Sequence, residues 1–320
     1  MLFQRDHVRQ TMNRLADKHG IYLGTSSWKY PDWCGLLYDE ENYLHNRRFS
    51  KARFERECLR EYAQTFRSVC VDATYYRYPK ESYLHGLAEQ VPAGFKLSFK
   101  VPDDITIKTY PELKAFGGRA GKPNHDFLDV AMARYGFLRM LEPIRDQVGL
   151  IAFEFSHFGH DDFERGRDFV DALDRFFQEM PDGWQFGVEV RNRNLLHPAY
   201  FEMLSRHGVA HIYNQWTHMP SVREQLEISP LQDQPFVAAR FLISEGRPHA
   251  WAREKMAPFN RIYEVDPDSR ATLQQMLDWL GANRQPGNPS SDFLYIGNEL
   301  EGCGLHTLAD VVETCDWLKV

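Results

Sequence analysis

Eight short apolar runs, separated by longer stretches of helical character, constrain the fold of this chain more than any other feature. The runs are Ile21–Thr25, Ser68–Asp72, Phe95–Lys100, Val148–Phe155, Trp184–Arg191, Val209–Tyr213, Phe236–Phe241 and Phe293–Gly297. Strands that alternate with helices form a parallel sheet, and eight such units close into a barrel. We therefore predict an α/β fold, a (β/α)8 TIM-type barrel. A doubly wound open sheet is the alternative, but no glycine-rich phosphate turn supports it.

The stretches between these runs have helical periodicity or helix-start signals, such as a serine at position 50 that can cap a helix. We predict helices over Ser50–Phe66, Lys80–Gln90, Asp126–Arg145, Phe163–Glu179, Pro198–His207, Asp268–Asn283 and Leu305–Leu318. Only the crossover Gln215–Gln234 has no clear helix. No linker divides the chain, and Gln285–Ser291 is predicted as an ordinary loop. We expect one TIM-barrel domain over residues 1–320, with residues 1–20 as an N-terminal helical extension.

The composition is that of a soluble globular protein. Of the 320 residues, 43% are apolar, which is enough for a large core, and no run has the length of a membrane span. The five cysteines form no C-x-x-C pair, so neither a disulfide framework nor a cysteine-rich zinc site is expected. The net charge of −7 disfavours nucleic acid as a partner without ruling it out. We expect a cytoplasmic protein with no membrane partner and no cofactor; the oligomeric state stays open.

Four of the connections from a strand to the next helix are long: Ser26–Phe49, Val101–His125, Gln215–Gln234 and Leu242–Pro267. In a barrel these loops all lie at the carboxyl ends of the strands, where active sites of such barrels lie. Ordering long loops costs entropy, so they usually serve a function. The sequence therefore predicts a site at this mouth of the barrel.

Polar residues collect where the predicted strands end. The arginines can bind a carboxylate or a phosphate through two donors, so we expect a small anionic ligand. Glu189 and Glu154 are the candidate acid–base residues, and Glu189 should pair with a cation when the pocket is empty. The candidate substrate-binding residues are Thr25, Ser26, Trp28, Thr74, Tyr76, Lys100, Arg191, Arg240 and Asn298.

Other interpretations stay open. The charged residues can form a network that satisfies itself without a ligand. His157 and His160, followed by Asp161 and Asp162, have residue types that suit zinc or manganese, but a solvated loop explains them better. Glu154 and Glu189 would also suit glycoside hydrolysis, which is disfavoured because Arg191 would keep Glu189 ionised. Cys34 and Cys303 lie in predicted loops at the mouth and have no identifiable activating base.

Several of these segments resemble, in the same order, the motifs of the YecE-like family, the family numbered 72 among domains of unknown function. The segments are Gly24–Trp33 (GTSSWKYPDW), Val71–Pro79 (VDATYYRYP), Gly94–Pro102 (GFKLSFKVP) and Val188–Arg191 (VEVR). The likeness extends from about Tyr22 to the C-terminus. It implies a TIM-type barrel and no established activity.

The chain departs from the family pattern at several strand ends. Relative to that pattern, Glu154 replaces a frequent glutamine, Asn192 a histidine and Asn214 an aspartate, while Arg240 is kept. The resemblance therefore implies a specialised mouth. Three functions compete: an enzyme acting on a small anionic, phosphorylated or nucleotide-like substrate, a metal-dependent hydrolase or nuclease, and a non-catalytic barrel that binds a ligand or partner.

Overall fold

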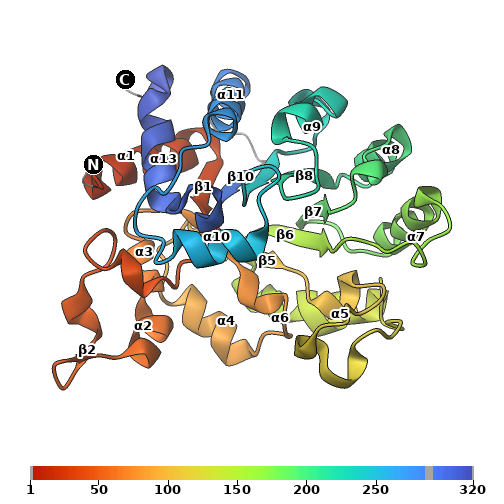
Figure 1. Ribbon diagram of the computed structural model, residues 1–320, viewed down its shortest axis with the longest axis horizontal. Helices are drawn as coiled ribbons and strands as arrows, with labels where there is room; N and C mark the ends of the chain where they lie inside the picture. The colour runs from red at the N-terminus through yellow and green to blue at the C-terminus, as the bar shows by residue number, and fades with distance from the viewer. Residues whose placement is uncertain (1–2, 285–290, 319–320) are drawn as a thin grey trace.

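The computed structural model describes residues 3–284 and 291–318, with eight strands at the centre of a ring of helices (Figure 1). The strands are β1 (Ile21–Thr25), β4 (Ser68–Val71), β5 (Lys96–Lys100), β6 (Val148–Phe155), β7 (Gln185–Val190), β8 (Ala210–Gln215), β9 (Ala238–Phe241) and β10 (Asp292–Ile296). Each predicted run corresponds to one strand, and no end differs by more than two residues. The predicted strands are thus confirmed.

All eight strands run parallel, in the order β1–β10–β9–β8–β7–β6–β5–β4. Each strand lies beside the strand before or after it in the series, and β1 lies beside the last one. The sheet therefore curls until β4 comes next to β1, as expected of a (β/α)8 barrel. The predicted fold class is confirmed.

The barrel closes between β1 and β4 through a short stretch of backbone. Ser26 and Cys70 form a parallel bridge, and the Ser27 amide donates a hydrogen bond to the Cys70 carbonyl at 3.1 Å. One step earlier, a Cβ atom on Gly24 would lie only 2.2 Å from the Ser68 carbonyl oxygen. Glycine at position 24 therefore permits the close approach of the two strands.

Buried hydroxyl groups complete this closure. The Tyr62 hydroxyl accepts a hydrogen bond from the Thr25 amide at 3.0 Å and donates one to the Ser68 carbonyl at 3.1 Å. Inside the barrel, the Tyr295 hydroxyl lies 2.5 Å from Ser68 Oγ and 2.6 Å from Ser98 Oγ. Polar groups at this level of the interior are satisfied among themselves, as burial requires.

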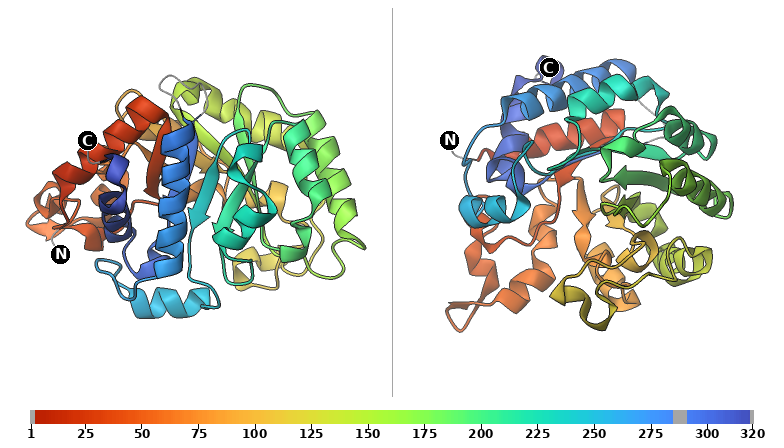
Figure 2. Two further views of the ribbon diagram at one scale, coloured as in Figure 1. Left: turned by 90° about the horizontal axis from the view of Figure 1, so that it is seen from above. Right: turned by 45° about the vertical axis from the view of Figure 1, so that its right-hand side comes forward.

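Helices cover the outside of the barrel (Figures 1 and 2), and apolar residues on them, such as Leu15 and Leu173, are buried in the core. The N-terminal helix α1 contacts β1 and α13. Ser50 caps α2 as predicted, by accepting from the Arg53 amide. The covering helices are α1 (Arg5–His19), α2 (Lys51–Glu57), α3 (Leu59–Tyr62), α4 (Glu81–Ala88), α6 (Arg139–Leu141), α7 (Gly166–Gln178), α8 (Pro198–Arg206), α9 (Val222–Ile228), α11 (Pro267–Asn283) and α13 (Gly304–Thr314).

Two helix predictions need correction. The crossover Gln215–Gln234 does contain a helix, α9, which Ser221 and Glu224 start with a reciprocal capping box. The stretch Asp126–Arg145 is not one regular α-helix. It contains a π-helical segment (Met132–Leu138), the short α6 and a 3₁₀ segment (Glu142–Gln147). Pro143, in the first turn of the 3₁₀ segment, has no amide hydrogen with which to continue the α-helical hydrogen bonding.

The long loops carry short elements of their own at the carboxyl ends of the strands. These are the hairpin β2 (Leu44–His45) with β3 (Arg48–Phe49), α5 (Asp103–Thr106) and α10 (His249–Met256). A further short helix, α12 (Asn298–Glu301), begins two residues after the end of β10. Helix α10 lies across one end of the barrel (Figures 1 and 2). No helix within 3–284 and 291–318 has the length and apolar character to cross a membrane. Residues 285–290 of the predicted loop Gln285–Ser291 lie outside the described residues.

Candidate functional site

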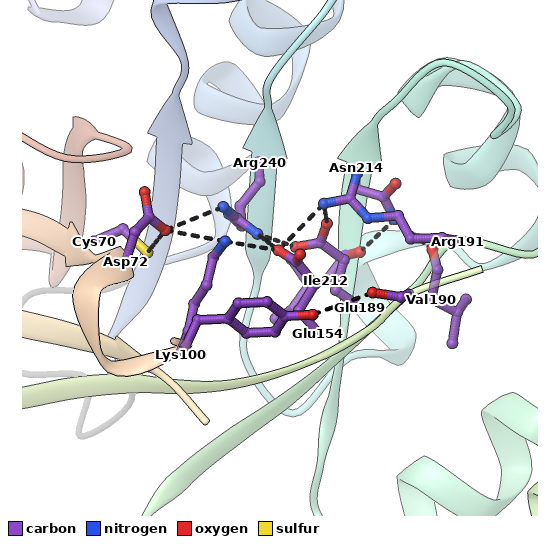
Figure 3. Close-up of polar contacts among 12 residues, drawn as sticks. Cys70, Asp72, Lys100, Glu154, Glu189, Val190, Arg191, Ile212, Asn214 and Arg240 are labelled. Carbon is purple, nitrogen blue, oxygen red and sulfur yellow. Dashed lines mark hydrogen bonds and ion pairs between the residues drawn. The ribbon is translucent and has the colours of Figure 1, made fainter. Parts of the chain in front are cut away.

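Charged side chains from five strands meet at the carboxyl end of the barrel (Figure 3). They belong to the last residues of β5, β6, β7 and β9 or directly follow β4 and β7. Because side chains two apart on a strand share a face, Glu189 and Arg191 both turn into this group. We call the six residues the charged cluster: Asp72, Lys100, Glu154, Glu189, Arg191 and Arg240.

Glu154 is the centre of the charged cluster. Its Oε2 atom lies 2.9 Å from Lys100 Nζ and 2.5 Å from Arg240 Nη1. The same oxygen lies 3.2 Å from Arg191 Nη2. One carboxylate oxygen thus contacts three cations that arise from three different strands.

Glu189 lies beneath this level and is fully buried. Its Oε1 lies 2.5 Å from Arg191 Nη2, and its Oε2 lies 2.6 Å from Arg240 Nη1. The expectation that Glu189 pairs with a cation in the empty pocket is therefore confirmed. A buried carboxylate without such partners would be very costly, so both arginines are held in place from below.

Asp72 completes the cluster on the β4 side. Its Oδ1 lies 3.1 Å from Lys100 Nζ and 3.6 Å from Arg240 Nη2. Asp72 directly follows β4 and opens a 3₁₀ turn, so its side chain is at the upper edge of the barrel and partly exposed. With Asp72 included, three carboxylates balance three cations in the cluster.

The pairing fixes the ionisation of the cluster. Burial alone would raise the pKa of Glu154, but Lys100, Arg191 and Arg240 outweigh it and hold that pKa well below its ordinary value. For Lys100, burial and Arg240 oppose the charged form, yet Asp72 and Glu154 raise the pKa above the ordinary value of a lysine. Glu154 and Lys100 are therefore both charged at neutral pH.

A cavity of about 340 Å³ lies above the charged cluster. Five of the six cluster residues line it, all except Glu189. Its remaining walls come from the long loops and from the helices that those loops carry. They comprise Ser26, Tyr30, Tyr76, Trp216, Leu242, His249, Arg253, Phe259, Gly297 and Glu299.

The cavity brings together six of the eleven residues that the sequence singled out: Ser26, Tyr76, Lys100, Glu154, Arg191 and Arg240. Glu189 is directly below them. The other four, Thr25, Trp28, Thr74 and Asn298, are buried nearby and do not line the cavity. The Thr25 and Thr74 hydroxyls donate to backbone carbonyls, and Asn298 Oδ1 accepts from the Gly304 amide. Binding roles for these four stay predictions.

Sequence reasoning missed most of the upper wall. Trp216 directly follows β8, and its ring centre lies 3.9 Å from the Arg191 guanidinium. His249 and Arg253 come from α10, and Glu299 from α12. The sequence predicts only a long loop over Leu242–Pro267, the segment that contains α10. The amphipathic pattern of α10 is too weak to indicate that one face of the helix lies against the barrel mouth.

His249 and Glu299 lie close together at the edge of the cavity, with His249 Nε2 and Glu299 Oε1 3.8 Å apart. Burial, then Arg253, Arg191 and Lys100, lowers the pKa of His249. Burial raises the pKa of Glu299, and Asp72 adds to this effect. The two shifts make the difference between the pKa values of His249 and Glu299 smaller than the ordinary difference between an imidazole and a carboxyl group. A smaller difference in pKa favours proton exchange between the two groups.

The weaker sequence candidates find no support in the geometry. Within residues 3–284 and 291–318 no group of three or more His, Cys, Asp or Glu side chains could hold a metal ion, His157 and His160 included. The thiols of Cys34 and Cys303 are free, and burial raises the pKa of each to about 11. Such a thiol is protonated at neutral pH and is a poor nucleophile.

Comparison with known proteins identifies the family of this chain and solved structures with a similar fold. The family described as "Protein of unknown function DUF72" matches residues 22–316. Two solved structures of a DUF72 family protein from Enterococcus faecalis have TM-scores of 0.60 and 0.59 to this chain, at 14% and 16% identity. They cover 92% and 93% of this chain and 95% and 98% of their own. A DUF72 family protein from Thermotoga maritima has a TM-score of 0.59 at 17% identity, covering 92% of this chain and 98% of its own. No curated protein matches the chain significantly in sequence.

Proposed function

Because this chain belongs to the DUF72 family of unknown function, we propose an activity from its pocket alone: the chain is an enzyme that binds a small substrate with an anionic group at the carboxyl-end mouth of the barrel. The observation that carries the proposal is the state of Arg253. This arginine lines the cavity, is exposed, and makes no ion pair with any residue that the structure describes.

The other cations of the pocket are already engaged. Lys100, Arg191 and Arg240, which the sequence favoured as anion ligands, are paired with the three carboxylates of the charged cluster. The cluster is neutral as a whole, so it does not attract an anion by net charge. Arg253 supplies a cation that is in no ion pair within residues 3–284 and 291–318 and whose interaction with Glu299 lowers the pKa of that carboxyl group. Arg191 adds one more donor, because its Nη1 is buried without a hydrogen-bond partner among the same residues.

The two glutamates have different parts in this proposal. Glu154 borders the cavity, and a substrate group that draws Lys100 or Arg191 away would raise the pKa of Glu154 toward a useful range. Glu189 has no access to the cavity, so it acts as a positioning residue that holds Arg191 and Arg240. Catalysis by Glu154 therefore depends on prior binding of the substrate.

A second function, a non-catalytic ligand-binding barrel, is favoured by one specific observation. Every carboxylate of the charged cluster is paired, and the pKa of Glu154 is held well below its ordinary value. A carboxylate in that state is a weak base. Turnover of a bound compound, measured in a metabolite mixture by mass spectrometry, separates the enzyme from the binder.

The binding test uses inorganic phosphate as the probe and isothermal titration as the readout. Arg253→Gln should abolish binding, because it removes the unpaired charge and leaves the charged cluster intact. Arg223→Gln is a matched control, since Arg223 is also exposed but lies on α9 outside the cavity. Equal phosphate binding by the wild type and Arg253→Gln would contradict the proposal.

A further inference from the structure

We propose that the substrate of this pocket is a phosphorylated sugar, with its hydroxyl groups on the charged cluster and its phosphate toward Arg253. The proposal rests on the proposed function for the anionic group and adds the chemistry of the rest of the molecule. Three features support it: free donors and acceptors on the cavity floor, an exposed aromatic ring at the edge of the cavity, and the balance of charge.

Two carboxylate oxygens on the floor of the cavity accept no hydrogen bond from the described residues. The contacts of Glu154 with its three cations all use Oε2, and Oε1 accepts no hydrogen bond from the described residues. Asp72 contacts Lys100 and Arg240 through Oδ1, and its Oδ2 accepts no hydrogen bond from the same part of the chain. Both residues line the cavity, so two acceptors remain for a ligand.

Donors lie beside these acceptors. Ser26 Oγ and Arg191 Nη1 are buried and have no hydrogen-bond partner among the described residues, and both residues line the cavity. A phosphate group has only acceptors when ionised and would be repelled by Glu154 and Asp72. A hydroxyl group both donates and accepts, so adjacent hydroxyl groups can satisfy this mixed floor.

The distribution of charge in the cavity indicates which end of the ligand binds at which place. Three carboxylates and three cations make the charged cluster neutral, which suits uncharged hydroxyl groups. The unpaired Arg253 lies at the exposed side of the cavity, on α10, and suits the phosphate. The cavity volume of about 340 Å³ falls within the range of small-molecule sites.

An aromatic side chain is available for the sugar ring. Tyr76 lines the cavity and is 74% exposed, far more than the other aromatic residues of the wall. A large exposed ring at the edge of a charged cavity offers an apolar surface to the C–H face of a sugar. Trp216 is less available, because one face of its indole is occupied by Arg191.

The test compares three ligands by isothermal titration: inorganic phosphate, propyl phosphate and ribose 5-phosphate. Propyl phosphate has the charge and carbon chain without the hydroxyl groups. Ribose 5-phosphate should bind about tenfold tighter than propyl phosphate, since two hydrogen bonds to charged groups are gained. Adenosine 5′-monophosphate, a fourth arm, distinguishes a free sugar phosphate from a nucleotide with the same ribose phosphate.

Two variants test which residues cause the preference for ribose 5-phosphate over propyl phosphate. Asp72→Asn replaces a free acceptor by a donor and should remove most of the preference for ribose 5-phosphate over propyl phosphate. Tyr76→Ala should reduce that preference about threefold without affecting folding, because Tyr76 is exposed. Tyr135→Ala, which truncates a tyrosine that is 63% exposed and outside the cavity, is the matched control and should change nothing.

The outcomes separate the two proposals. If no phosphate compound binds in a manner that depends on Arg253, the proposed function is wrong. Two other outcomes would contradict the sugar phosphate while leaving the proposed anion-binding site intact. One is equal binding of propyl phosphate and ribose 5-phosphate. The other is a preference for ribose 5-phosphate that persists in both Asp72→Asn and Tyr76→Ala. Should Asp72→Asn fail to fold, Tyr76→Ala alone decides.

Discussion

The guanidinium group of Arg191 lies 3.9 Å from the centre of the Trp216 ring, while its Nη2 lies 2.5 Å from Glu189 Oε1. The indole covers the guanidinium plane and the carboxylate fixes one edge. Arg191, which lines the cavity, is thereby oriented by two groups from different strands, while its Nη1 has no hydrogen-bond partner among the described residues. This arrangement pre-organises a donor before any ligand arrives.

We expect Trp216→Leu to weaken binding of ribose 5-phosphate about two- to thirtyfold, because a cation–π contact of about 0.5–2 kcal/mol that holds Arg191 is lost. Isothermal titration measures this effect. Trp251→Leu is the control, since Trp251 stacks on Arg247, at 5.1 Å, away from the cavity. Unchanged affinity in Trp216→Leu would show that the indole does not position Arg191 for binding.

Arg240 should matter more for stability than for binding. It is 2% exposed and contacts three carboxylates, so Arg240→Gln leaves Glu154 and Glu189 undercompensated. Breaking a buried pair in this way costs about 3–5 kcal/mol of unfolding free energy. Urea unfolding measures the loss, with Arg253→Gln as the control that should unfold like the wild type. Equal stabilities of the two variants would contradict this account of the cluster.

The stability of the protein should fall with acid partly through Glu154. Its pKa in the folded state is well below its unfolded value of about 4.3, so its contribution is complete above about pH 5 and is lost progressively as the pH falls below the unfolded pKa toward the folded one. Between pH 5 and pH 3, the melting temperature of Glu154→Gln should therefore fall less than that of the wild type. Glu202→Gln, at an exposed site on α8, should follow the wild-type curve. Parallel curves for Glu154→Gln and the wild type would refute the assignment.

Tyr62→Phe should weaken the closure of the barrel. The substitution leaves the Thr25 amide and the Ser68 carbonyl without their shared hydroxyl partner in a buried position. Each unsatisfied buried group costs about 1–3 kcal/mol, so the unfolding free energy should fall by at least about 1 kcal/mol. Thermal unfolding checks this, and Tyr76→Phe, at an exposed position, should have no effect. A stable Tyr62→Phe protein would mean that Gly24 and the Ser26–Cys70 bridge suffice for closure.

Much of the barrel could be predicted because strands and helices follow local patterns. The apolar runs around Leu23 or Ile151 indicate buried strands wherever they occur, and their bounds were correct to within two residues. Helix α9 was missed although Ser221 and Glu224 have the spacing of a capping box, because the segment is short and its apolar pattern weak. The strand-end position of polar residues also predicted which face holds the cavity.

The sequence by itself determined the strands, the parallel order that they favour, and the presence of charged groups at the strand ends, since each depends on residues near one another in the chain. Only the tertiary structure decided that Glu154 contacts Lys100, Arg191 and Arg240 at once, and that Arg253 of α10 lines the cavity above them. Glu154 and Arg240 are 86 positions apart in the sequence, and the curvature of the closed sheet brings them together. No local pattern encodes that curvature, because it arises from the packing of all eight strands.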